Sequence, residues 1–376
     1  MTASFVLNAR TEIRKTAAVI PEQTLYLPYD IRTELKWLDF SGTSNPLGTP
    51  PSFLKAMHTA LVDGGLEFSP DREARKLRSI LARRYELKPE SFLCGTSINE
   101  MIRCAAQTFQ PCVVGICVPT MPGYLNAIFN AGHKVIELSD PHTFVVPDAS
   151  TARRNRTQFD AAVLANPTYP TSRLLSKATL LSYLESCKWV IVDESLIELT
   201  LGGESMVSLT ERYRNLIIVR SLVHSFAMPG VPISYCVAHP ETIVSMHNCF
   251  DCSGISMFAE VIAEIAGSEE EHIENARELL ETEIPWMQCM LNLIPGIHIF
   301  PAEGNFVMCS YEKGAATDLA VANTEELVSR LQVAGFLVKK LKGMPGIVNG
   351  KYFCVAVRKR EENEKLLRAL REIILP

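Results

Sequence analysis

Short, nearly continuous runs of Val, Ile and Leu alternate with helical segments from residue 91 onward, and this pattern constrains the fold most. Strands that are apolar throughout must be covered on both faces, as in a parallel sheet. The helices between them supply the crossovers. We therefore predict an α/β fold whose large domain has a mostly parallel, doubly wound sheet. The runs are SFLCGTS, CVVGICVPT, KVIELS, FDAAVLANP, KWVIVDES and NLIIVRSL.

The pattern changes toward the C-terminus. A long helix is expected to start at a capping box formed by Ser268 and Glu271. The last 90 residues or so alternate differently and are typical of a small α+β domain. We predict an N-terminal arm (1–37), a large domain (38–284) and a small C-terminal domain (285–376) that packs with the arm.

Composition excludes several classes of protein. The 376 residues are 47% hydrophobic and include 37 Lys and Arg against 42 Asp and Glu. Without a cationic surplus, nucleic acid is not an expected partner. No apolar stretch reaches the ~18 residues of a membrane span, and the N-terminus lacks the apolar core of a signal peptide, so we expect a cytoplasmic protein without a membrane partner. Cys249 and Cys252 form one C-x-x-C with no second ligand pair, so no metal site is predicted.

Functional residues are expected where the strands end, because ligands in such sheets bind at the carboxyl ends of the strands. The segments concerned are 95–100, 119–124, 166–172, 193–196 and 221–230.

Several of these strand ends, read in order, carry motifs that resemble one known family. The motifs are LDFSGTSNPLG, SPDREARKLR, CGTSINEMI, PTMPGY, NPTYPTS, VIVDESLIEL and NLIIVRSLVHSFAMPGVPISY. Together they resemble the fold-type I pyridoxal phosphate enzymes, especially histidinol-phosphate aminotransferase and threonine-phosphate decarboxylase. The resemblance implies a homodimeric transferase or lyase of biosynthesis that acts on a small molecule. It also implies a set of cofactor contacts: Gly95, Thr96 and Ser97 for the phosphate, Tyr124 and Asn166 for the ring, Asp193 for the pyridinium nitrogen and Ser221 on the phosphate side.

The same motifs depart from the family at the residues that carry its chemistry. His224 falls on the Schiff-base lysine, and an imidazole cannot form the aldimine that a primary amine makes. Pro232 falls on the arginine that pairs with the phosphate. Tyr169 stands where the family has the asparagine that contacts the ring hydroxyl, and Leu196 stands where it has the tyrosine that follows the aspartate. Cys354 takes the position of the arginine that clamps the substrate carboxylate.

These departures leave three hypotheses open. The first is a divergent enzyme without the Schiff-base lysine, acting on a small amino-acid-like or phosphorylated metabolite with His224 as acid or base. Such an enzyme either binds pyridoxal or pyridoxamine phosphate noncovalently or has lost the cofactor, and Asp193, Tyr169 or Cys354 would assist. The second is a noncatalytic binding or scaffold protein, whose pocket would be plugged by side chains such as Tyr169 and Leu196. The third is a pyridoxal phosphate-dependent aminotransferase or decarboxylase whose lysine lies elsewhere, for instance Lys339 or Lys340.

Overall fold

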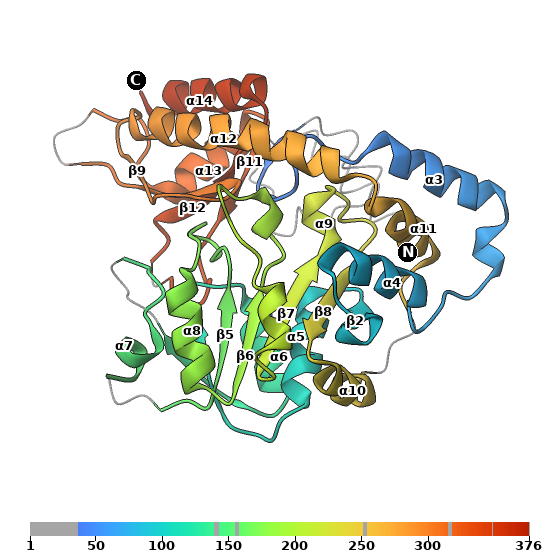
Figure 1. Ribbon diagram of the computed structural model, residues 1–376. Helices are drawn as coiled ribbons and strands as arrows, with labels where there is room; N and C mark the ends of the chain where they lie inside the picture. The colour runs from blue at the N-terminus through green and yellow to red at the C-terminus, as the bar shows by residue number, and fades with distance from the viewer. Residues whose placement is uncertain are drawn as a thin grey trace, which may run out of the picture.

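The protein is built around two sheets, shown by a computed structural model (Figure 1). The structure describes residues 37–138, 143–154, 158–250, 254–314, 318–347 and 349–375. Residues 1–36 of the expected arm and Cys252 lie outside this part of the chain. Among the described residues, no helix combines the length and apolar character that crossing a membrane requires.

The larger sheet has seven strands and confirms the predicted α/β class. Its β8 runs antiparallel to both of its neighbours, and the other strands are parallel to one another. The sequence pattern did not identify β8. In spatial order the strands are β2 (Phe92–Gly95), β8 (Ser234–Ala238), β7 (Leu216–Ser221), β6 (Trp189–Asp193), β5 (Ala161–Ala165), β3 (Val113–Cys117) and β4 (Lys134–Leu138).

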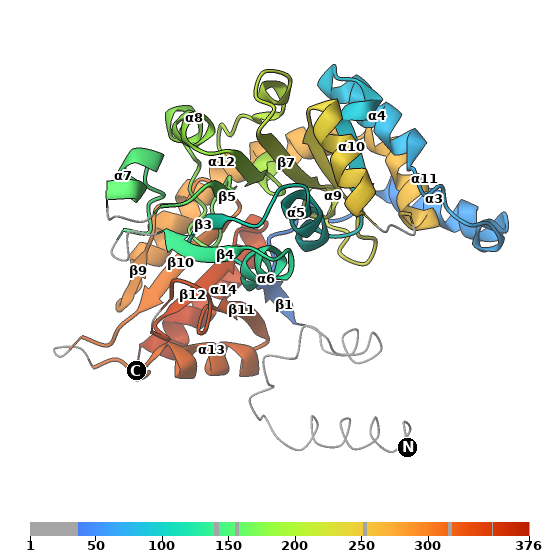
Figure 2. The same ribbon diagram turned by 90° about the horizontal axis from the view of Figure 1, so that it is seen from below.

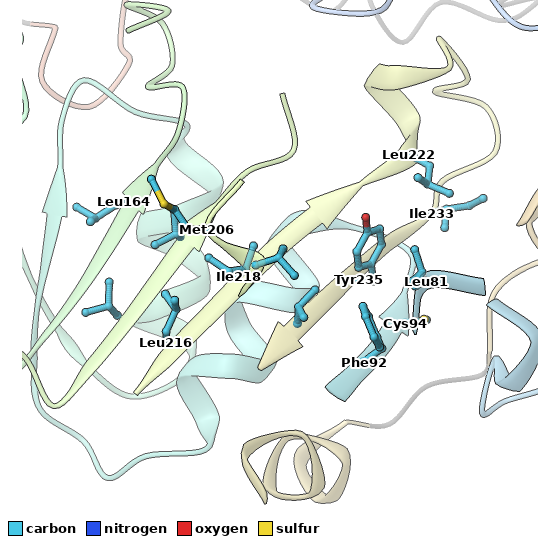
Figure 3. Packing of buried hydrophobic residues seen from close by; sticks show 14 of the residues in the cluster. Leu81, Phe92, Cys94, Leu164, Met206, Leu216, Ile218, Leu222, Ile233 and Tyr235 are labelled. Carbon is cyan, nitrogen blue, oxygen red and sulfur yellow. The ribbon is translucent and has the colours of Figure 1, made fainter. Parts of the chain in front are cut away.

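Helices cover both faces of this sheet, which is why most of its strand residues are apolar. Adjacent strand residues such as Val163 and Leu164 belong to separate clusters on opposite faces. Figure 3 shows part of one cluster, where Leu81 of α4 lies near Phe92 and Tyr235 of the sheet. This face is covered by α4 (Arg75–Tyr85), α8 (Lys177–Ser186) and α11 (Met257–Ala266), and the other by α5 (Ile98–Gln107), α6 (Pro122–Asn130) and α10 (Pro240–Cys249).

The smaller sheet has five strands and one helix-covered face (Figure 2). Alternate residues of its strand β10 face opposite ways: Val307 and Cys309 pack in the cluster with the helices, whereas Phe306 and Met308 lie on the other face. In order, the strands are β1 (Leu38–Phe40), β11 (Phe336–Lys340), β12 (Tyr352–Ala356), β10 (Phe306–Tyr311) and β9 (Ile297–Ile299). The helices are α12 (Glu270–Asn292), α13 (Thr324–Val333) and α14 (Arg360–Ile374).

Two details differ from the sequence expectations. The range 38–284 assigned to the large domain includes β1, but this strand pairs with β11 in the smaller sheet. The long helix begins at Glu270 without a side-chain cap, because the Ser268 hydroxyl donates to the Ile265 carbonyl of the preceding helix (2.7 Å). The long helix also continues past residue 284 to Asn292, so it belongs to both predicted domains.

Candidate functional site

The carboxyl ends of β2, β5, β6 and β7 meet at the edge of the large sheet that faces the smaller one (Figure 1). The two sheets are joined there through residues 303–305. Leu201 N donates to the Glu303 carbonyl (2.6 Å), and Glu303 N donates to the Ser172 carbonyl (2.8 Å). Asn305 Nδ2 donates to the Thr43 carbonyl (2.8 Å). The predicted site residues lie around this junction.

Asp193, at the end of β6, is held by two donors. Its Oδ1 accepts from the backbone N–H of Ser195 (2.8 Å), and its Oδ2 accepts from the hydroxyl of Tyr124 on α6. Both side chains are 5% exposed. Burial raises the pKa of the Asp193 carboxyl, and burial together with the nearby carboxylate raises the pKa of Tyr124 well above its ordinary value. The Tyr124 hydroxyl therefore takes the carboxylate that the resemblance assigns to a pyridinium nitrogen.

The predicted phosphate loop is also engaged from within. Ser97 caps α5, since its side chain accepts from Glu100 N (3.2 Å). The Glu100 carboxylate in turn accepts from Thr96 N (3.1 Å) and from Thr96 Oγ1 (2.8 Å). Gly95 lies against Met101, and a Cβ placed at Gly95 would meet the Met101 methyl at 2.4 Å. An internal carboxylate thus uses the Thr96 donors that an anion would need.

The side chains of Ser221 and Asn166 form hydrogen bonds with backbone groups of neighbouring segments. Ser221 Oγ donates to the Ile233 carbonyl (2.9 Å) and accepts from Val223 N (3.2 Å), which caps the short helix α9 (Leu222–Ser225). Asn166 Oδ1 accepts from Leu175 N (2.9 Å). Pro232 is exposed and brings neither charge nor an N–H donor.

His224 lies on α9, directly after β7, and the loop after β1 closes over it. Its Nδ1 is 3.2 Å from Thr43 Oγ1, and its carbonyl accepts from Asn45 N (2.9 Å). Asn45 Nδ2 also donates to the Ser225 carbonyl (2.8 Å). Burial lowers the pKa of His224 from 6.5 to about 4. The imidazole is therefore neutral at pH 7 and has a nitrogen that can accept a proton.

Tyr169 and Cys354 meet in an apolar cluster between the two sheets. Cys354 Sγ donates to the Pro170 carbonyl (3.5 Å), and the rings of Tyr169 and Phe306 are 5.3 Å apart. Leu196 lies in the same cluster. Burial raises the pKa of both Tyr169 and Cys354 well above their ordinary values, so both side chains are protonated at neutral pH. Their surroundings favour packing over nucleophilic or basic roles.

Lys339 lies in the same row as Cys354. Cys354 of β12 is directly opposite Met308 of β10 and Lys339 of β11, so these three side chains share one face of the small sheet. Lys340 belongs to the opposite face and pairs with Glu325 (3.8 Å). Of the two lysines, Lys339 therefore shares a sheet face with the apolar cluster, and Lys340 does not.

Four charged residues beside the site were not predicted as site residues from the sequence. Arg220 of β7 binds Glu194 (3.1 Å) and Glu198 (2.8 Å), and Arg84 of α4 also binds Glu198 (2.8 Å). Burial alone would raise the pKa of Glu198, but Arg220 and Arg84 hold it below its ordinary value. The network joins the segment after β6 to β7 and α4. Glu194, Glu198 and Arg220 lie in the quoted motifs and Arg84 lies outside them, and nothing in their local spacing predicts that they meet.

The structure collects the predicted residues at one junction but in separate groups. Tyr124 contacts Asp193, Thr96 contacts Glu100, and Tyr169 packs near Cys354. Among the described residues, no hydrogen bond joins His224 to Asp193. The partner of His224, Thr43, had no sequence signal, whereas Glu100 follows Ser97 at the spacing of a capping box.

Comparison with known proteins identifies related chains and structures. Residues 36–370 match the family profile described as aminotransferase class I and II. Histidinol-phosphate aminotransferase of Chlorobaculum tepidum is 28% identical over 76% of this chain and 80% of its own. The structure of L-threonine-O-3-phosphate decarboxylase from Porphyromonas gingivalis has a TM-score of 0.78 at 20% identity, covering 89% of this chain and 98% of its own. Histidinol-phosphate aminotransferase from Sinorhizobium meliloti, solved in complex with pyridoxal-5'-phosphate, has a TM-score of 0.75 at 17% identity, covering 93% and 95%.

Proposed function

Since this chain belongs to the class I and II aminotransferase family, we propose that it is a divergent enzyme of that family that works without a Schiff-base lysine. It acts on a small amino-acid-like or phosphorylated metabolite at the junction between the two sheets. His224 accepts a proton from the substrate, and pyridoxal phosphate is not held in the family's manner. We also propose that the working form is a homodimer.

The contact between Tyr124 and Asp193 carries this proposal. A pyridine nitrogen and the Tyr124 hydroxyl would compete for the same carboxylate. The residues on the phosphate side also do not fit the cofactor, because Thr96 donates to Glu100 and position 232 is a proline. Pyridoxal phosphate would therefore meet a carboxylate and Thr96 donors that already have internal partners.

His224 is in the protonation state that a base requires. A neutral imidazole accepts a proton without first losing one, but the burial that keeps it neutral also makes it a weaker base than an exposed histidine. If Nδ1–H donates to Thr43 Oγ1, Nε2 is left as the accepting atom. Thr43 then orients the ring, and Asn45 fixes the peptide that carries it.

A cofactor titration tests the absence of the aldimine. Incubating the purified protein with pyridoxal phosphate should give no visible aldimine band that borohydride abolishes. The double variant His224→Lys, Tyr124→Phe should gain one, because it restores the amine and frees Asp193. A reducible band in the wild type that disappears in Lys339→Ala would instead support the pyridoxal phosphate enzyme with a displaced lysine.

Deuterium exchange tests the role of His224. L-threonine O-3-phosphate and histidinol phosphate are incubated with the protein in D₂O and followed by NMR. Exchange of a carbon-bound hydrogen should fall about 100-fold or more in His224→Gln if the imidazole is the base. Equal exchange rates in wild type and variant would contradict the role.

The apolar cluster favours a second candidate, a noncatalytic binding protein. Leu196, Cys354 and Phe306 are buried together, and Tyr169 packs against them, so they fill the part of the junction where the resemblance places the substrate carboxylate. This candidate predicts calorimetric binding of one of the two probes with neither turnover nor exchange. The enzyme predicts exchange that depends on His224.

A further inference from the structure

A cavity of about 220 Å³ opens beside the loop that follows β5, and Thr168 of that loop is one of its lining residues. Phe144, Val146, Leu174 and Leu175 give it apolar walls, and Arg173 and Glu303 are its charged lining residues. Its volume equals about seven water molecules at ~30 Å³ each. That space suits a molecule the size of leucine and is too small for a nucleotide.

The two charges at this cavity are not neutralised by each other. Among the described residues, the Arg173 guanidinium has no hydrogen bond or ion pair, and the Glu303 carboxylate accepts only from Leu174 N (2.9 Å). Arg173 is half-buried, as is Glu303. Partly desolvated charges without an opposite charge beside them are unfavourable, and a ligand with a carboxylate and an ammonium group would supply one to each.

Ser172 holds these two residues in place. Its carbonyl accepts from Glu303 N (2.8 Å), and its hydroxyl accepts from Gly304 N (2.9 Å). Ser172 and Phe144 both adopt left-handed backbone conformations, with φ of 60° and 54°. Such conformations are unfavourable for side chains with a Cβ and persist where the surroundings impose them, often at binding sites. The cavity is therefore preorganised.

We propose that this cavity binds a small zwitterionic amino acid with an apolar side chain. Arg173 takes the carboxylate in a bidentate manner, Glu303 takes the ammonium group, and the side chain packs on Phe144, Val146 and Leu174. His224 does not line the cavity, so this site stands apart from the proposed chemistry. The His224→Gln variant should bind the amino acid as the wild type does.

Calorimetry on the full chain tests this site with L-leucine, 4-methylpentanoic acid and 3-methylbutylamine. L-leucine should bind saturably, and each analogue, which lacks one charge, should bind at least about tenfold more weakly. Arg173→Ala and Glu303→Gln should each weaken L-leucine by about tenfold or more. Arg368→Ala, an exposed arginine on α14, serves as the matched control and should bind normally.

Several results would overturn the assignment. They are no saturable heat with L-leucine, L-valine or L-phenylalanine, equal affinity for L-leucine and 4-methylpentanoic acid, or unchanged affinity in Arg173→Ala. If Arg173→Ala does not fold, Arg173→Lys replaces it. A lysine keeps the charge but lacks the planar fork, so affinity should fall severalfold, and an unchanged value would again exclude the arginine contact.

Discussion

At the residue scale, the surroundings of His224 decide what the side chain can do. Thr43 and Asn45 come from a loop that is about 180 residues away in sequence, and they hold the ring and its peptide. Burial in this place lowers the pKa to about 4. An exposed histidine would be partly charged near neutral pH, whereas this one is neutral.

This lowered pKa predicts a pH dependence of stability. In the unfolded chain His224 binds a proton below about pH 6.5, its ordinary pKa, whereas in the folded chain it does so only as the pH approaches 4. The free energy of unfolding should therefore fall as pH decreases from 6.5 to 4, by on the order of 2 kcal/mol from this group. Urea unfolding of wild type and His224→Gln across this range measures the difference.

Asp193 provides the control for that measurement, because its raised pKa acts in the opposite direction. The folded chain keeps the Asp193 proton above the ordinary value of 3.8, so this group makes stability fall as pH rises toward its raised pKa. The comparison is therefore repeated in an Asp193→Asn background. If the contribution of His224 has the same size at pH 4 and pH 7 there, the imidazole is not held neutral by the fold.

At the element scale, a buried ion network fixes the ends of the strands. Arg220 is 4% exposed and lies between Glu194 and Glu198, and Arg84 brings α4 to the same carboxylate. Arg277 of α12 donates to the Glu198 carbonyl (3.0 Å). The network thus connects β7, the segment after β6 and two helices around the site.

Removing the central cation should be far more damaging than removing a surface one. Arg220→Met leaves two buried carboxylates without their main partner and should lower the free energy of unfolding by about 3–5 kcal/mol. Arg214→Met breaks an ion pair with Glu241 whose side chains are 68% and 70% exposed, and should change it by less than about 1 kcal/mol. Chemical denaturation of both variants measures this, and equal losses would show that the network is not a stabilising centre.

At the scale of the whole molecule, α3 (Pro51–Val62) and the following turn project from the body (Figure 1). This segment exposes large apolar side chains: Leu54, Leu61, Val62, Leu66 and Phe68, at 47–73% of their surface. Exposed apolar segments of this kind are typical of surfaces that contact another protein. A second copy of the chain is the partner consistent with the proposed homodimer.

The dimer should therefore depend on this segment. The double variant Leu66→Asp, Phe68→Asp places two charges in the apolar surface and should raise the dimer dissociation constant at least about tenfold, measured by sedimentation equilibrium. Val333→Ser changes a side chain of similar exposure on α13 and should leave association unchanged. A monomeric wild type, or a double variant that dimerises normally, would contradict the assignment.

The parallel strands, their covering helices and the edge that carries the site followed from local pattern. Residues 161–165 and 189–192 are apolar throughout, and this property depends only on neighbouring residues. The assignment of β1 did not follow, because three residues pair with a strand nearly 300 residues away. The same pattern of serine and glutamate three residues apart also gave two outcomes: Ser97 caps a helix, but the Ser268 hydroxyl is used by the preceding turn.

The sequence by itself determined the class of fold, the family and which residues gather at the strand ends. Only the tertiary structure decided how these residues are used: Tyr124 bonds to Asp193, Thr43 contacts His224, and burial keeps His224 neutral. The reason is physical. Periodicity records which face of an element is buried, whereas hydrogen bonds and pKa values depend on distances between groups that only packing brings together.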